Sequence, residues 1–462
     1  MGHRQNSQSE TSNPKSFFDV VIIGGGLSGL AAAVKLALHG ARIALFEQSP
    51  KLGGRCYSYV DETTGDVVDN GQHVLVGAYH NTLEFLRLIG TRNLLSHQER
   101  LRLPLHHPTK GFAAFEVSSL PRPFHLSAGM LKLKLLSLRD RRNLLNVGFT
   151  LVSWNDALEK KLSCLTVEQW LDSLTQSEEA KKALWYPVAI SVMNELPHRA
   201  SALLFARSLK STFLGRKSDS AILIPRVGQT ELYVCEAEKL LLSKNAKIFT
   251  NAEVEEIEIQ RSAATGVRLK NGVRVQANRV IGCVPHYSLG NLLPAKIRQE
   301  TPFCTLSKFQ SSAIISIHLW LDIDCMKEDY VGLIGRRLQW IFNRKRILGK
   351  EGNAGGYISS VMSGAHEFVG MTKNELVAIS LEDLQGVYPE LRRARLIHSV
   401  VIKEKRATFS PTNDIDPYRP STETPIRNLL LAGDWTNTGL PGTIEGAVLS
   451  GFKAADCVIG TV

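Results

Sequence analysis

The sequence predicts an α/β protein in which parallel strands alternate with helices, and three features of the chain support that class. An apolar run at 19–23 leads directly into a glycine-rich turn, and an alanine- and leucine-rich segment follows at 30–39. A second apolar run occupies 41–46, and a third, at 429–432, precedes another glycine-rich loop. Short apolar runs of this kind are typical of strands buried on both faces of a parallel sheet.

Composition and charge narrow the function classes. The chain has 462 residues, enough for two or three domains, with 44% hydrophobic and 21% charged residues, which excludes collagen-like, coiled-coil and mostly disordered chains. The 55 basic and 44 acidic residues give a net charge of +11, which favours an anionic partner. Seven scattered cysteines without a CxxC pair indicate neither a zinc site nor a disulfide framework. We therefore expect a reducing, cytoplasmic compartment and no metal.

Neither a signal peptide nor a membrane-spanning segment is expected. Residues 1–16 are polar and lack an apolar core, so they are interpreted as a flexible leader. No apolar run reaches the ~18 residues of a transmembrane helix. The longest run, 311–321, contains His318 and is typical of a buried strand.

Residues 19–46 are expected to form one β-α-β unit, whose helix ends at Gly40. The turn after the first strand has the spacing GxGxxG, which is typical of a Rossmann-like fold. Its first glycine permits a tight turn, the second lets a pyrophosphate approach the backbone, and the third lets helix and strand pack closely. Backbone N–H groups at the start of the helix then face the phosphates. The turn residues are Gly24, Gly26, Leu27, Ser28 and Gly29.

Two features follow the second strand of this unit. Glu47 lies 23 positions after Gly24, close to the ~20 expected for an acid that binds a ribose. Its carboxylate disfavours a 2′-phosphate, so NADP is the less expected ligand. The turn Gly53–Arg55 is small enough to lie against a cofactor, and its guanidinium can reach a phosphate or a flavin. The alternative for this turn is a solvated surface loop.

A comparable arrangement occurs near the C-terminus. The strand at 429–432 ends at Gly433 and Asp434, and a loop containing Gly442 opens the last helix. The N-terminus of that helix suits the anionic edge of a reduced flavin, and Asp434 can bind the ribityl chain. Glu445 either contacts the cofactor or only stabilises its own helix.

Further elements are predicted from caps and turns. Ser137 can cap a helix with Asp140 at its third position, and Glu375 completes a capping box. Turns are expected at Thr265–Gly266 and at Asn271–Gly272, the second being a strong hairpin signal. In chain order, we expect helices within 126–152, at 166–174 and at 177–192, short strands within 247–284, a strand at 312–321, a helix at 372–385, a strand at 429–432 and a final helix after Gly442.

The glycine-rich segments lie at opposite ends of the chain yet suit one ligand, and together they resemble the flavin amine oxidase and phytoene desaturase superfamily. The resemblance implies FAD and a strand at 252–257 against the adenine. We expect the FAD to be noncovalent, because no residue identifies itself as an attachment site and Cys457 lies past the flavin loop. It also implies a discontinuous Rossmann-like FAD-binding domain at 17–100, 225–300 and 404–462, and a mixed α+β substrate domain at 101–224 and 301–403. The positions matched to FAD contacts are Gly24, Gly26, Leu27, Ser28, Gly29, Glu47, Gln48, Gly53, Gly54, Arg55, Gly71, Gln72, Val254, Gly433, Asp434, Gly442, Thr443, Ile444 and Glu445.

Within the superfamily, the chain looks most like the hydroxysqualene dehydroxylases of bacterial hopanoid pathways. Asn194–Pro197 departs from the pattern of that family and puts the local substrate contacts in doubt. The matching segments are 69–75, 101–105, 339–342, 406–409, 432–436 and 438–441.

The resemblance implies that a reduced flavin replaces the allylic hydroxyl of hydroxysqualene by hydride, giving squalene. Because hydroxide is a poor leaving group, a general acid or a positioned water should assist. His73, Asp69 and Tyr79 are the candidates. The alternatives are that Asp69 caps a turn and that His73 is a packed, hydrogen-bonded residue.

The expected partners follow from this chemistry. The substrate would be a long-chain isoprenoid lipid, and the electron donor stays unassigned. The stretch 131–145 interleaves leucines with five basic residues, which fits either a helix on the anionic cytoplasmic face of a membrane or a cap helix with a solvated basic face. Nucleic-acid binding is disfavoured because no recognised module is present.

Three competing functions stay open. A carotenoid desaturase or amine oxidase would share the cofactor site but move hydride from substrate to flavin. A prenyl-lipid escort protein of the same fold would not be an enzyme, although such proteins tend to lose flavin contacts that this chain keeps. A nicotinamide enzyme is weaker, because the sequence has no second GxGxxG unit to bind NADPH.

Overall fold

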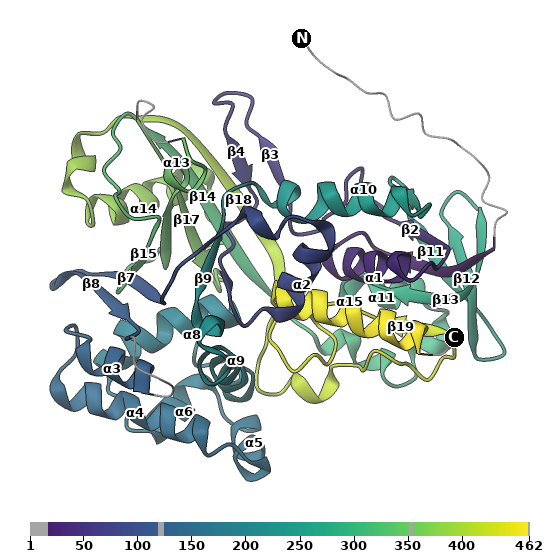
Figure 1. Ribbon diagram of the computed structural model, residues 1–462, viewed down its shortest axis with the longest axis horizontal. Helices are drawn as coiled ribbons and strands as arrows, with labels where there is room; N and C mark the ends of the chain where they lie inside the picture. Colours follow the sequence, from purple (N-terminus) through teal and green to yellow (C-terminus); the bar gives the residue numbers. More distant parts are fainter. Residues whose placement is uncertain (1–16, 119–123, 351–354, 461–462) are drawn as a thin grey trace.

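The computed structural model describes residues 17–118, 124–350 and 355–460 (Figure 1). The leader expected at 1–16 lies outside the described residues. Two seven-stranded sheets and a layer of helices make up most of the chain. Among the described helices, none has both the length and the apolar character needed to cross a membrane.

The first sheet has the order β10-β2-β1-β13-β12-β11, with β19 paired to β13. Its centre is parallel and fully buried, as the apolar runs predict, whereas β11, β12 and β13 form an antiparallel extension. The predicted α/β class is therefore confirmed. The strands are β1 (Phe18–Ile23), β2 (Ile43–Phe46), β10 (Lys247–Phe249), β11 (Val254–Gln260), β12 (Ala263–Leu269), β13 (Arg274–Gly282) and β19 (Leu429–Leu431).

The first and last helices of the chain pack side by side on this sheet (Figure 1). They are α1 (Leu27–Leu38) and α15 (Ile444–Ile459). A Cβ at Gly451 would lie 2.2 Å from the carbonyl oxygen of Ser28, so only glycine permits this approach. Lys35 and Asp456 add an ion pair of 2.6 Å. This contact brings the two ends of the chain together.

The second sheet has the order β18-β14-β17-β16-β15-β7-β8. Its strand β14 confirms the expected buried strand, and β18 extends past the predicted domain boundary at 403/404 toward the first sheet. All strands of the first sheet fall within the segments predicted for the cofactor domain; the boundaries themselves stay predictions. The strands are β7 (Arg102–His107), β8 (Gly111–Glu116), β14 (Ser311–Leu321), β15 (Tyr330–Leu333), β16 (Trp340–Asn343), β17 (Gly356–Ser363) and β18 (Leu396–Phe409).

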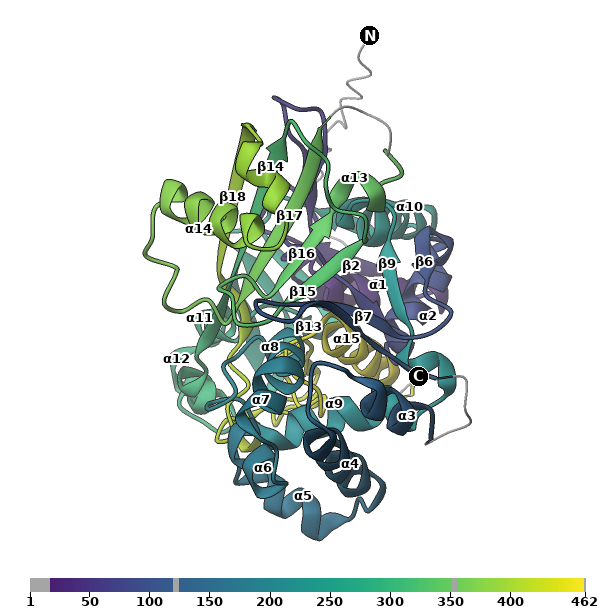
Figure 2. The same ribbon diagram turned by 90° about the vertical axis from the view of Figure 1, so that its left-hand side faces the viewer.

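Helices between β8 and β9 form a layer that shares one apolar core with strands of the second sheet (Figure 2). Ser137 caps α4, as its sequence indicates, and Thr166 caps α6 through a capping box. The helices are α3 (Phe124–Lys132), α4 (Leu138–Val152), α5 (Asp156–Ser163), α6 (Val167–Ser173), α7 (Glu178–Ala180), a π-helical turn (Lys181–Trp185), α8 (Tyr186–Met193) and α9 (Ala202–Leu214).

The remaining elements connect these layers. Thr372 and Glu375 form the expected capping box of α14. The other helices are α2 (His80–Ile89), α10 (Glu236–Ser243), α11 (His286–Leu292), α12 (Ala295–Arg298), α13 (Arg344–Ile347) and α14 (Lys373–Gln385). The other strands are β3 (Ser58–Val60), β4 (Val67–Asp69), β5 (Leu75–Val76), β6 (Leu95–His97) and β9 (Ile222–Pro225).

One turn prediction is confirmed and one is wrong. Asn271–Gly272 connects β12 to β13, as expected. Thr265–Gly266, however, lies inside β12, and the preceding turn is at Arg261–Ser262, where both residues have positive φ. A Cβ at Gly266 would lie 2.0 Å from the carbonyl oxygen of Val275. This glycine therefore permits a close approach between strands and does not form a turn.

Candidate functional site

The turn between β1 and α1 is shaped for close backbone packing and for an anion. Gly24 has a φ of +103°, and a Cβ at Gly29 would lie 1.9 Å from the carbonyl oxygen of Gly24. Among the described residues, no side chain caps the N-terminus of α1, and its first turn contains no acid. The N–H groups of Leu27 and Ser28 therefore lie at an uncapped positive helix end, which is suited to a phosphate.

Glu47 lies beside this turn at the carboxyl end of β2. Its carboxylate accepts the N–H of Gly25 and the N–H of Ser49, each at 2.8 Å. Because each carboxylate oxygen can accept a second hydrogen bond, ribose hydroxyls can still bind there. The backbone N–H of Ala252 donates to the Glu47 carbonyl at 2.9 Å, which brings the start of β11 at Val254 to the same edge. The neighbouring Gln48 is exposed.

Arg55 and Asp434 join the two ends of the sequence. The guanidinium donates to the Asp434 carboxylate at 2.7 Å and to the carbonyl of Ala407, at the end of β18, at 2.5 Å. Burial disfavours the charge on Arg55, but Asp434 outweighs it and raises the pKa of the guanidinium. Gly54 lies against Gly26, so the second glycine turn contacts the first. The predicted segments around 24–29, 53–55 and 433–434 therefore meet in one place.

The loop before α15 completes this arrangement. Thr443 caps α15 by accepting the N–H of Gly446 at 3.1 Å. A Cβ at Gly442 would lie 2.8 Å from Thr408 on β18 and 3.3 Å from the Asp434 carboxylate. Ile444 packs against the core beneath α1. Gly433, with a φ of +150°, donates its N–H to the Ser450 hydroxyl at 2.8 Å.

Glu445 has partners on α2 that neither sequence interpretation includes. Its buried carboxylate accepts the N–H and side-chain amide of Asn81 at 3.0 and 2.8 Å, and the N–H and hydroxyl of Thr82 at 2.9 and 2.7 Å. It therefore stabilises the N-terminus of α2, and it also lies in the first turn of its own helix, as one of the two interpretations expects. Any contact from Glu445 to a cofactor must come from its backbone.

The loop at 69–73 lies along Arg55, because the side-chain amide of Asn70 donates to the Arg55 carbonyl. Gly71 accepts the side-chain amide of Gln229 at 2.5 Å. Gln72 accepts a hydrogen bond from Arg344, so its side chain points away from Arg55 toward the second sheet.

The three catalytic candidates lie in different surroundings. Asp69 is fully buried and forms an ion pair of 2.8 Å with Arg344. Burial raises the pKa of Asp69, and the Arg344 charge opposes that rise. His73 is half-buried near Arg55; burial and that charge lower its pKa to about 4. Tyr79 precedes α2, where burial and the Glu445 charge raise the phenol pKa well above its usual value. His73 and Tyr79 are therefore both neutral at pH 7.

Comparison with known proteins identifies the family. The model of the flavin containing amine oxidoreductases matches residues 27–459, nearly the whole chain. The chain belongs to this family. It is 30% identical over 465 residues to a hydroxysqualene dehydroxylase from Zymomonas mobilis, covering 95% of this chain and 98% of the relative. A 15-cis-phytoene desaturase from an Oncidium hybrid cultivar is 25% identical over 97% of this chain and 79% of its own.

The fold agrees with that membership. The solved structure of an oxidoreductase from Methanosarcina mazei superimposes with a TM-score of 0.72 at 20% identity, over 95% of this chain and 99% of that one. As a member of the amine oxidoreductase family, the chain is a flavin-dependent oxidoreductase.

The residues present fit a flavin nucleotide. The space above Gly26 is open: in the described part of the chain, the atom nearest to an added Cβ is the Gly54 Cα at 4.0 Å. The uncapped end of α1 lies beside that opening, and Glu47 stands one strand away. A dinucleotide requires an anion site at a helix end, a glycine that leaves room for the pyrophosphate, and an acid that can bind the ribose, in that sequence along the fold. The start of α1, Gly26 and Glu47 are placed in this way.

Three positioning residues carried no sequence signal or only a weak one. Buried Arg419 donates to the backbone carbonyls of Asp434 at 3.0 Å and Thr436 at 2.6 Å, and so fixes the loop after β19. Arg344 holds Asp69, as described above. Asn194 adopts a left-handed backbone and donates to Thr408 at 2.9 Å, within the segment that departs from the family pattern. The sequence alone does not indicate that an arginine outside any motif is buried.

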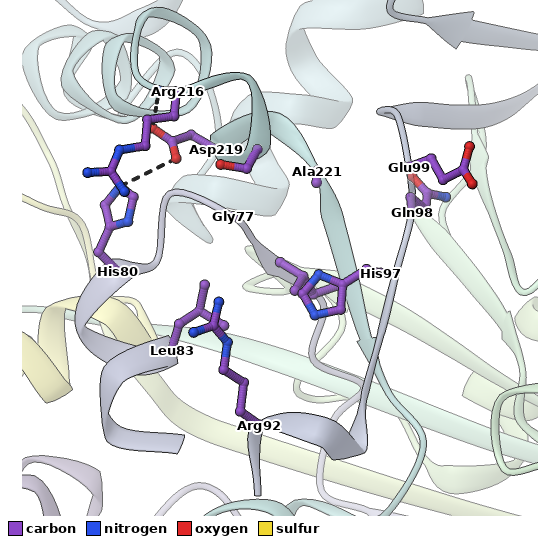
Figure 3. A pocket seen from close by; sticks show the side chains of 12 residues that line it. Gly77, His80, Leu83, Arg92, His97, Gln98, Glu99, Arg216, Asp219 and Ala221 are labelled. Carbon is purple, nitrogen blue, oxygen red and sulfur yellow. Dashed lines mark hydrogen bonds and ion pairs between the residues drawn. The ribbon is translucent and has the colours of Figure 1, made fainter. Parts of the chain in front are cut away.

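Hollows in the described part of the chain include the following two. A small one adjoins Arg55 and Asp434 and is lined by Pro285, His286, Tyr287, Ser311, Arg406, Thr408, Phe409 and Trp435. A separate cavity of about 250 Å³ lies between α2 and β9 (Figure 3). There, His80 approaches Asp219 at 3.5 Å, and Arg92 and His97 line another side. None of the site residues expected from the sequence lines this second cavity.

Proposed function

We propose that the chain binds FAD without a covalent link and reduces hydroxysqualene to squalene. The observation that carries this proposal is the 30% identity to a hydroxysqualene dehydroxylase over nearly the full length of both chains. The convergence of Gly26, Arg55 and Asp434 supports it, because it supplies one nucleotide site from three distant segments. A long-chain isoprenoid lipid is therefore the proposed substrate, and its electron donor is left open.

When bound and reduced, FAD supplies the hydride that replaces the allylic hydroxyl, while one proton leaves with that hydroxyl as water. The chain's own contribution is to hold the nucleotide and to manage the proton. The start of α1 and Glu47 hold the phosphates and the ribose. Arg55 fixes Asp434 and the end of β18, so both walls of the site keep one geometry.

His73 is proposed to position a water molecule or the substrate hydroxyl. With a pKa of about 4, its imidazole is neutral at pH 7 and cannot act as a standing cationic acid. A neutral imidazole still offers one donor and one acceptor. Asp69 is engaged by Arg344, so it is proposed to hold the 69–73 loop. Tyr79, a neutral phenol, is the second proton-donor candidate.

The His73 proposal is tested with His73→Gln and His73→Ala, by the rate at which reduced enzyme is reoxidised by substrate in a single turnover. We expect the alanine variant to lose about 10²-fold, a typical contribution of proton-transfer groups, with partial recovery by glutamine. His39→Gln, at an exposed helix end, is the control. A wild-type rate in both His73 variants would remove this residue from the mechanism.

Product analysis tests the reaction itself. Photoreduced protein is incubated anaerobically with hydroxysqualene, and the lipid is analysed by mass spectrometry. We expect squalene in a one-to-one ratio to flavin oxidised. Unchanged hydroxysqualene, with a competent reduced flavin, would contradict the proposal.

A phytoene-type desaturase is the second candidate, because the chain also matches a phytoene desaturase over most of its length. It would run hydride in the opposite direction. Oxidised protein incubated with phytoene separates the two: new double bonds in the lipid favour the desaturase, and unchanged phytoene favours the dehydroxylase. A protein purified without flavin would instead favour a lipid escort.

A further inference from the structure

The outer face of α4 is apolar although it faces solvent. Leu138, Phe149 and Val152 are 71%, 68% and 61% exposed. The opposite face of the same helix, with Leu144 and Val147, is buried in the core of the helical layer. A helix on the surface of a water-soluble domain normally presents polar residues on its outer face. The outer face of α4 departs from this pattern.

Basic side chains surround these apolar residues. Lys132, Lys134, Arg139 and Arg142 are exposed, and within the described ranges none of them pairs with an acid. Arg141 differs, because it donates to the carbonyls of Leu136 and Leu131 and holds the turn between α3 and α4.

The segment is also strongly unbalanced in charge. Residues 124–152 contain five basic residues and one acid, Asp140. Asp140 is engaged at the start of α4, where Ser137 donates to its carboxylate at 2.6 Å. The α3–α4 face is defined here as Leu131, Lys132, Lys134, Leu138, Arg139, Arg142, Phe149 and Val152.

We propose that the α3–α4 face docks onto the surface of an anionic lipid bilayer. Apolar side chains on a helix that lies in the interfacial plane enter the acyl boundary, while flanking lysines and arginines contact anionic headgroups. The α3–α4 face has both components: exposed apolar side chains at Leu138, Phe149 and Val152 are the first, and cations without an acidic partner among the described residues are the second. An apolar protein partner would explain the first component but not the second.

The position of this face is useful for a lipid substrate. Helix α4 packs on α9, which packs on α8 (Figure 2). Asn194 is the C-cap of helix α8 and contacts Thr408, and Thr408 lies against Gly442 in the candidate cofactor loop. One layer of helices thus separates the proposed membrane surface from the site. The docking proposal rests on the surface alone and does not depend on which lipid is the substrate.

Vesicle co-sedimentation of the full holoprotein tests the proposal. We expect binding to vesicles of phosphatidylcholine with 30% phosphatidylglycerol at low salt, weaker binding at high salt, and little binding to pure phosphatidylcholine. Arg139→Gln with Arg142→Gln should lower partitioning roughly fivefold for each charge removed. Leu138→Ser with Phe149→Ser should lower it by about tenfold or more.

A matched control lies on α10, where Leu242 and Lys244 are also exposed. The variant Leu242→Ser with Lys244→Gln should bind vesicles like the wild type. Because every altered residue is exposed, flavin content and circular dichroism should stay unchanged, which separates lost docking from lost folding.

Three outcomes would overturn the proposal. In the first, the wild-type protein does not bind anionic vesicles. In the second, vesicle binding falls equally in the α3–α4 and α10 variants. In the third, the wild-type protein is a dimer that does not bind vesicles, and Phe149→Ser dissociates it. The third would assign the face to a second copy of the chain. Reduction of hydroxysqualene in detergent micelles without vesicle binding would overturn docking while leaving the proposed function intact.

Discussion

Among the ion pairs that join distant parts of this chain, Arg55–Asp434 and Arg344–Asp69 differ in their surroundings and in their roles. The side chain of Arg55 is 37% exposed, and it stands beside an open glycine turn. The side chains of Arg344 and Asp69 are 0% and 2% exposed and face only protein. The first pair therefore borders the candidate ligand site, whereas the second is buried within the fold.

The comparison shows how burial changes the consequence of losing a partner. A charge left alone near the open site can recruit water, so its loss should weaken ligand binding more than folding. A charge left alone in the interior cannot recruit water, so its desolvation cost lowers the free energy of unfolding. The two pairs should therefore separate flavin affinity from stability.

Arg344→Met should have the largest effect. It leaves the Asp69 charge buried without its partner, and we expect a loss of about 3–5 kcal/mol in the free energy of unfolding. Urea denaturation measures this loss. Asp69→Asn in the same chain should recover part of it, because no unpaired charge then remains. Equal stability of wild type and Arg344→Met would show that the pair is not a buried anchor.

The surroundings of Arg344 also predict a pH dependence. His318 is fully buried beside Tyr357, and burial lowers its pKa to about 3 from an unfolded value near 6.5. The unfolded chain thus binds more protons below pH 6.5. This contribution to stability is complete above pH 6.5 and is lost as the pH falls toward 3, by about 1.4 kcal/mol per pH unit.

His318→Gln should reduce that slope by the same amount. Urea denaturation at pH 5 and pH 7 measures it in both proteins. If stability depends on pH equally in the wild type and the variant, His318 is not a neutral residue in the folded protein.

Arg55→Lys should have the smallest effect on the free energy of unfolding, but it should clearly lower the affinity for flavin. Lysine cannot reproduce both hydrogen bonds to Asp434 and Ala407, so flavin affinity should fall roughly 10- to 100-fold. Flavin fluorescence quenching measures the affinity. Arg42→Lys, in an exposed ion pair with Asp19, is the matched control and should bind flavin normally. A large loss of stability without loss of affinity would reverse the comparison.

The two pairs also differ in what could be read from the sequence. Arg55 and Asp434 lie in glycine-rich turns whose spacing has a known physical purpose, so their convergence was predictable. Arg344 and Asp69 are 275 positions apart, and no periodic pattern relates them. Glu445 was assigned to a ligand or to its own helix because its true partners, Asn81 and Thr82, lie more than 360 positions away.

Strand, helix and cap positions were predictable where the signal is local. The caps at Ser137 and Thr372 follow from neighbouring residues alone. The error at Gly266 has the opposite cause. A glycine in a strand can mark a turn or a close approach, and only the contact with Val275 decides between them.

We propose above all that the first glycine turn and the Asp434 segment hold one flavin. Gly26→Ala tests it most directly, since an added Cβ has room in the described fold yet would occupy the space that a pyrophosphate needs. Asp434→Asn is the variant at the other end of the site, and Gly290→Ala, also at an open position, is the control. Flavin titration measures the affinity of each protein. We predict that Gly26→Ala stays folded and loses roughly 100-fold in affinity, about 2.7 kcal/mol, that Asp434→Asn is also weakened, and that Gly290→Ala is unchanged. Wild-type affinity in Gly26→Ala and Asp434→Asn, or a wild-type chain that binds no flavin, would contradict the account.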